Sequence, residues 1–131
     1  EESWHIRFAL WLNFFVFASA FPAILCGDVE IVHGWNSTLT GEWQVLIVFG
    51  SVTFLNGAAL WSWWQDGVAG ALASVKVALV ANISFNAIDI WTGLRTSRTR
   101  PSADALAPLP DLMLCAFALL TLPRDAAGPM L

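Results

Sequence analysis

Four apolar segments alternate with polar stretches along this chain. Each segment runs for about 20 positions, the length at which an α-helix crosses a hydrocarbon core of about 30 Å. The pattern predicts an all-α fold, an integral membrane bundle of four transmembrane helices that forms a single domain over residues 1–131. The expected spans are Trp4–Leu25, Trp43–Trp64, Val68–Trp91 and Ala105–Leu122.

Prolines and one short turn mark the ends of these spans. Pro22 falls near the end of the first span, where its missing N–H distorts the last helical turn. Pro108 and Pro110 fall in the first turns of the fourth span, where proline is better tolerated. Only Gln65–Gly67 separates the second span from the third, so these two helices are expected to form an antiparallel hairpin.

The composition favours lipid as the solvent of this chain. Apolar residues make up 57% of the sequence and charged residues 12%, whereas a soluble domain averages about 45–50% and about 25%. The net charge of −4 gives no basic surface and excludes nucleic acid as a partner. Because the chain begins at Glu1, we expect either a fragment or a mature protein whose targeting peptide has been removed, for example in a thylakoid or inner mitochondrial membrane.

Tryptophans support the number of spans. Four spans place both termini on one side of the membrane, here called side A, and the opposite side is called side B. Tryptophan is enriched at membrane interfaces, and seven of the eight tryptophans fall near one of the two expected interfaces. Those at side A are Trp4, Trp61, Trp63 and Trp64, and those at side B are Trp35, Trp43 and Trp91.

Polar residues inside the expected spans fall into two layers. At a rise of 1.5 Å per residue, Asn13, Asn56 and Lys76 each lie roughly 12–14 Å from side A, with Cys115 near that level. Asn82 and Asp111 form a second layer, roughly 9–14 Å from side B. Intramembrane polar groups usually face the interior of a bundle. These layers indicate either a polar pocket or proton-linked path, or ordinary hydrogen bonding between helices.

Two details of the third span bear on this choice. Asn82, Asn86 and Asp89 follow i, i+4, i+7 spacing and therefore lie on one face of the helix. Lys76 faces another direction, and a charge near the middle of a bilayer costs on the order of 3 kcal/mol. We therefore expect Lys76 to pair with a carboxylate, to extend towards side A, or to contact another subunit.

The sequence contains no catalytic motif and no set of metal ligands with a known spacing, which predicts a protein that is not an enzyme. His5 and His33 fall on opposite sides of the membrane, so they cannot hold one haem together. A pigment such as chlorophyll needs a single axial ligand, and carotenoids and lipids need none. The candidate axial ligands are His5, His33, Gln44, Asn82 and Asn86, although each is also explained as an ordinary interface or core residue.

The layout resembles that of the small DoxX-like four-helix membrane proteins. The similarity lies in Phe21-Pro22 at the end of the first helix, a polar loop with Gly27 and Gly34, the tight hairpin and a Gly/Ala-rich third helix. Because the functions of that family are heterogeneous, the resemblance implies a four-helix membrane fold and no site residues.

Three functions fit these observations. The first is a non-catalytic accessory subunit of a larger respiratory or photosynthetic membrane complex, which packs on neighbouring subunits, lipids and pigments. The second is a stand-alone four-helix protein that binds a small molecule or lipid in the Asn13, Asn56 and Lys76 layer. The third is a redox protein that uses Cys26 and Cys115, although their expected depths differ by roughly 15 Å.

Overall fold

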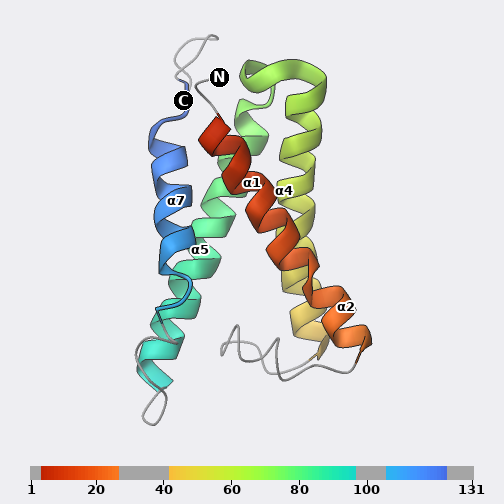
Figure 1. Cartoon of the computed structure of the whole chain (residues 1–131), viewed down its shortest axis with the longest axis vertical. Coiled ribbons are helices and arrows are strands. Elements are labelled where there is room, and N and C mark those ends of the chain that lie inside the picture. Colours follow the sequence, from red (N-terminus) through yellow and green to blue (C-terminus); the bar gives the residue numbers. More distant parts are fainter. Residues whose placement is uncertain (1–3, 27–41, 97–105, 124–131) are drawn as a thin grey trace.

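The computed structural model describes residues 4–26, 42–96 and 106–123, and within these residues all regular structure is helical. This confirms the predicted all-α class. Most of the helices run roughly along the long axis of the molecule, whereas the N-terminal helix lies obliquely to it (Figure 1). They are α1 (Trp4–Ala18), α2 (Ala20–Leu25), α4 (Glu42–Gly70), α5 (Leu72–Thr96) and α7 (Leu109–Leu120).

Three helical segments are long and apolar enough to cross a membrane, namely Trp4–Pro22, Leu46–Gly70 and Leu72–Arg95. The fourth expected span is shorter than predicted, because α7 has 12 residues and therefore covers about 18 Å of a core of about 30 Å. The reason lies in its prolines. Proline disfavours helical backbone in the residue before it, and the chain forms a turn at Leu106–Pro108 before α7 begins.

The first span is interrupted at Ser19, between α1 and α2. Pro22 has no N–H to donate to the carbonyl of Ala18, and its ring crowds that carbonyl. The Ser19 hydroxyl donates a hydrogen bond to the Val16 carbonyl at 2.6 Å, which satisfies a backbone acceptor next to the break. The distortion that Pro22 predicts therefore appears one turn before the proline itself.

Helices α4 and α5 run antiparallel, and their connection turns at Gly67 (Figure 1). Gly67 has φ 76°, a left-handed conformation that glycine adopts without strain. After this break a short helical segment reaches Gly70, and α5 begins at Leu72 rather than at Val68 as expected. Lys76 therefore lies about 6 Å along α5 from its first residue, half the depth that the sequence indicated.

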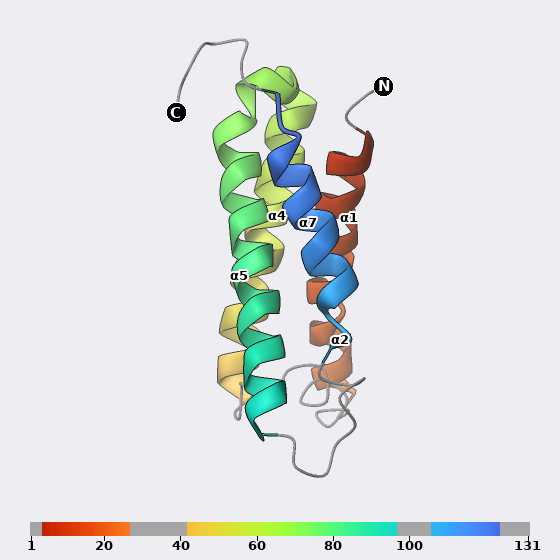
Figure 2. The same cartoon turned by 90° about the vertical axis from the view of Figure 1, so that its left-hand side faces the viewer.

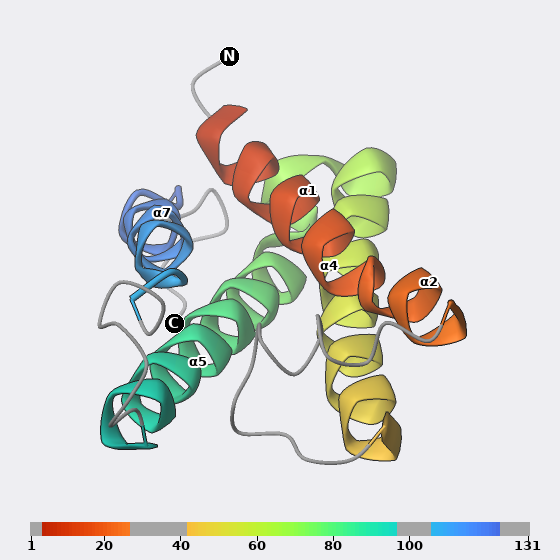
Figure 3. The same ribbon diagram turned by 60° about the horizontal axis from the view of Figure 1, so that its bottom comes forward.

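The four main helices form a ring in which α1 packs on α4, α4 on α5, α5 on α7 and α7 on α1. The beginning of α1, the end of α7 and the α4–α5 connection share one end of the bundle, as expected for side A (Figure 1). Figures 2 and 3 show that α7 stands between α1 and α5 and that α5 extends beyond it towards side B.

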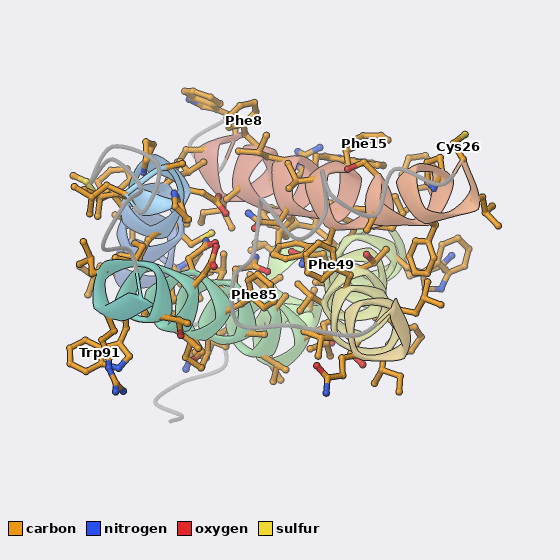
Figure 4. All side chains as sticks on the ribbon, turned by 90° about the horizontal axis from the view of Figure 1, so that it is seen from below. Phe8, Phe15, Cys26, Phe49, Phe85 and Trp91 are labelled. Atoms are coloured by element: carbon orange, nitrogen blue, oxygen red, sulfur yellow. The ribbon has the colours of Figure 1, made fainter. Side chains whose placement is uncertain are left out.

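The interior differs between the two ends. Near side A it is an apolar cluster that includes Ile6, Leu10, Val75 and Leu79. Towards side B an aromatic cluster joins α1, α4 and α5, with ring centroids 4.8–5.3 Å apart and the rings edge to face. Its members are Phe17, Phe49 and Phe85, of which the last two are labelled in Figure 4. The remaining interior, between α1, α5 and α7, is polar.

Candidate functional site

The centre of this polar region is the carboxylate of Asp111, in the first turn of α7. Asn13 Nδ2, from α1, donates to Asp111 Oδ1 at 2.8 Å. Asn86 Nδ2, from α5, donates to Asp111 Oδ2 at 2.8 Å. Each carboxylate oxygen is therefore held by an amide from a different helix, and the three side chains fix the relative positions of α1, α5 and α7.

Cys115 extends this centre by one turn of α7. Its Sγ lies 3.6 Å from Asp111 Oδ1, to which the thiol donates, and Asn13 Nδ2 donates to the sulfur at 3.4 Å. The thiol also interacts with the side chain of Asn82. Cys115 is buried and Cys26 is exposed, and both are free thiols. A disulfide between them, as the redox hypothesis would use, is not formed in the described structure.

A second polar contact joins α4 to α5. Asn56 Nδ2 donates to Asn82 Oδ1 at 2.9 Å, and Asn82 Nδ2 donates back to Asn56 Oδ1 at 3.0 Å. Asn56 also donates to the carbonyl of Val52 at 2.9 Å. Both side chains are completely buried. This reciprocal pair leaves neither amide oxygen without a donor.

The structure thus combines the two layers that the sequence separated. Asn13 bonds to Asp111, and Asn56 bonds to Asn82, so each pair takes one member from each expected layer. Depths counted along a helix axis assume that the helices begin level and run parallel. Here α1 crosses α4 obliquely (Figure 3), and α7 is short.

Lys76 is half-buried, and no described residue hydrogen-bonds or ion-pairs with it.

Two features distinguish the Asp111 centre from a closed hydrogen-bond network. Asn13 is fully buried, and its Oδ1 has no hydrogen-bond partner among the described residues, a situation that usually costs about 1–3 kcal/mol. No Lys, Arg or His of the described chain pairs with Asp111. The carboxylate is only partly buried. Within the described residues, the Asp111 carboxyl group therefore has no cationic partner, and the Asn13 Oδ1 atom has no hydrogen-bond donor.

The candidate pigment ligands do not gather in one place. His5 Nε2 is 2.7 Å from Thr121 Oγ1, and this hydroxyl already donates to the Phe117 carbonyl, so the imidazole is the donor. Gln44 is exposed near the start of α4 and has a partner, while His33 lies outside the described residues. Asn82 and Asn86 hold the contacts above. Pigment ligation stays a prediction, and through Asn82 it would require breaking the reciprocal amide pair.

Sequence reasoning assigned Asn86 to pigment binding and missed its contact with Asp111. It also placed Cys115 only by depth. The available signal was the spacing of Asp111 and Cys115, which at i, i+4 share one face of a helix. Among the described residues, no cluster of three or more His, Cys, Asp or Glu side chains is arranged to hold a metal ion.

No family model, curated protein or solved structure matches this chain. The resemblance to DoxX-like proteins therefore stays a prediction, and the function has to be argued from the arrangement of side chains.

Proposed function

We propose that this chain is an integral membrane protein that serves as a non-catalytic accessory subunit of a larger membrane complex, respiratory or photosynthetic. The observation that carries the proposal is the distribution of side chains. Five Asn and Asp side chains are buried inside the bundle, while many large apolar side chains are exposed on its surface. In water such a surface would far exceed the few hundred Å² of apolar patch that a soluble monomer exposes. In lipid the same distribution is expected.

The outer face of α1 supports the role of a subunit. An aromatic stripe follows i, i+4, i+7, i+11 spacing along this helix, and its members are 45–65% exposed. The stripe consists of Trp4, Phe8, Trp11 and Phe15. Phe8 and Phe15 point away from the bundle in Figure 4. Trp11 and Phe15 stack with centroids 5.5 Å apart. Such flat rings offer a large contact area to a neighbouring helix, a pigment or a lipid.

The test is the size and colour of the native particle. Native membranes are solubilised in a mild detergent, particles are separated by size, and visible absorbance is recorded where this chain migrates. We expect a large particle, and we expect the Trp11→Ala/Phe15→Ala variant to leave it while remaining folded. Ile47→Ala, on the exposed face of α4, is the matched control and should stay in the particle. Migration of the wild-type chain as a small colourless particle would contradict the subunit role.

An alternative function has one specific observation in its favour. An open groove of about 210 Å³ lies between α4 and α5 and is lined by Leu55, Ala58, Ala73, Ser74 and Val77. Its small, mostly apolar side chains suit an acyl chain or a small apolar molecule. It does not contain the Asn13, Asn56 and Lys76 layer in which the sequence placed a pocket. Ligand-dependent thermal stabilisation that is lost in Ala73→Phe would favour this alternative, and no stabilisation by any lipid would remove it.

A further inference from the structure

One face of α5 carries polar side chains into the bundle over about a third of the length of the helix. Asn82, Asn86 and Asp89 are 0%, 5% and 7% exposed, and their spacing places them on a single face. Counted from Thr96 at the side B end, Asp89 lies at about 10 Å and Asn82 at about 21 Å. Asn86 binds Asp111, and Asn82 binds Asn56. These residues form a polar track from side B to the middle of the bundle.

The track ends where the apolar cluster of side A begins. The buried cluster residues Ile6, Leu10, Val75, Leu79 and Ala118 lie within about 11 Å of the side A ends of their helices. Each is no more than 1% exposed. Polar groups therefore lead to Asp111 from side B, while tightly packed hydrocarbon separates it from side A. This asymmetry is a property of the whole bundle, because all four main helices contribute to it.

The charge of Asp111 needs a counterpart that the described chain does not supply. An ionised carboxylate is expensive inside a membrane unless it is paired or neutralised, and Asp111 has only neutral donors: Asn13, Asn86 and Cys115. The ionisable group in contact with it is Cys115 on α7, and Asp89 lies on the same face of α5 as its partner Asn86. The residues of α1 and α4 in this network, Asn13 and Asn56, are neutral. The Asn13 carboxamide that binds Asp111 also carries the buried Oδ1 that lacks a partner.

We propose that Asp111 is an exchangeable intramembrane site for a small hard cation, a proton or Na⁺, which reaches it from side B along Asp89 and Asn86. A proton would bind a carboxylate oxygen of Asp111 directly. Na⁺ would use a carboxylate oxygen together with carboxamide oxygens, which Asn13 and Asn86 can present because each carboxamide carries one acceptor oxygen. This site goes beyond the accessory role proposed above and does not depend on it.

The experiment is infrared difference spectroscopy on the full chain in lipid nanodiscs, following the C=O band of a protonated carboxyl group. We expect a band that appears on acidification, that persists in Asp66→Asn at the exposed side A end of α4, and that is absent in Asp111→Asn. Asn86→Leu keeps the carboxylate but removes one donor, so it should retain the band and move its midpoint. This variant keeps the test decisive where Asp111→Asn does not fold.

Adding NaCl or KCl at constant pH separates the two cations. Loss of the band with Na⁺ alone assigns the site to sodium, and equal behaviour in both salts assigns it to the proton.

Exchange into D₂O tests the path: Asp89→Leu should slow the isotope shift of the band several-fold, whereas Ile88→Leu on the outer face of α5 should not. If no band depends on Asp111 and neither salt affects the protein, the proposal is overturned.

Discussion

Two buried contacts between helices use the same chemistry in different ways. In the Asn56–Asn82 pair, the oxygen of each neutral amide accepts a hydrogen bond from the other amide. In the Asp111 centre, two amides and a thiol surround a carboxyl group, and one buried oxygen has no hydrogen-bond partner in the described part of the chain. A closed neutral pair needs nothing further and is sufficient as a structural contact. A charged, incompletely satisfied cluster is expensive, which makes it the better candidate for a site.

Replacing Asp111 with an apolar residue should have the largest effect on stability. In Asp111→Leu the amides of Asn13 and Asn86, on two helices, each lose the carboxylate oxygen that accepts from them, so we expect the free energy of unfolding to fall by about 2–3 kcal/mol. Asp111→Asn keeps an acceptor and removes the charge, so it should lose less. Reversible unfolding in mixed detergent micelles measures both. Equal losses would contradict this, because they would show that an acceptor at this position stabilises the bundle only when it is charged.

Breaking the neutral pair should have a smaller and recoverable effect. Asn82→Leu removes the donor to Asn56 Oδ1 and one acceptor of Asn56 Nδ2, and interhelical hydrogen bonds in membranes contribute up to about 1.7 kcal/mol. We therefore expect a loss of about 1–2 kcal/mol, measured in the same unfolding assay. The double variant Asn56→Leu/Asn82→Leu leaves no unpaired amide and should regain most of that loss. A double variant that is less stable than either single one would contradict the description of a self-contained pair.

A change at the α4–α5 connection should lower stability without affecting either contact. Gly67 has φ 76°, and a Cβ there would meet nothing within 4 Å, so Gly67→Ala tests backbone strain alone. With φ 76° and ψ 175°, this backbone lies in a region that costs a residue other than glycine about 1–3 kcal/mol, and the unfolding assay should show a loss of this size. Because the strain lies outside both polar contacts, Asp111→Leu should be additive with Gly67→Ala. Marked non-additivity would instead couple the turn to the Asp111 centre.

Lys76 should have the smallest effect. Since it lies about 6 Å from the beginning of α5, its stem can carry the ammonium group towards side A. We expect Lys76→Leu to change the free energy of unfolding by about 0.5 kcal/mol or less. A loss above about 2 kcal/mol would contradict this and place the Lys76 charge near the middle of the membrane. Release of the chain from its native particle would instead indicate that Lys76 contacts another subunit.

The sequence was informative where a single residue decides the local backbone. Pro22 predicted the distortion of the first span, and the short polar turn at Gly67 predicted the antiparallel hairpin. It failed to predict the partner of Asn13, which bonds to Asp111 on a short helix. That partner depends on helix tilt and on where each helix begins, and both are decided by packing between segments far apart in the sequence.

The difference between the two contacts is tested most directly by two double-mutant cycles, each measured at neutral and at acidic pH. One cycle couples Asn56 with Asn82, and the other couples Asn13 with Asp111. Hydrogen bonds to a charged acceptor are roughly twice as strong as neutral ones. We therefore predict that acidification weakens the Asn13–Asp111 coupling when Asp111 takes up a proton and leaves the Asn56–Asn82 coupling unchanged. If neither coupling depends on pH, the Asp111 centre is a structural contact like its neighbour.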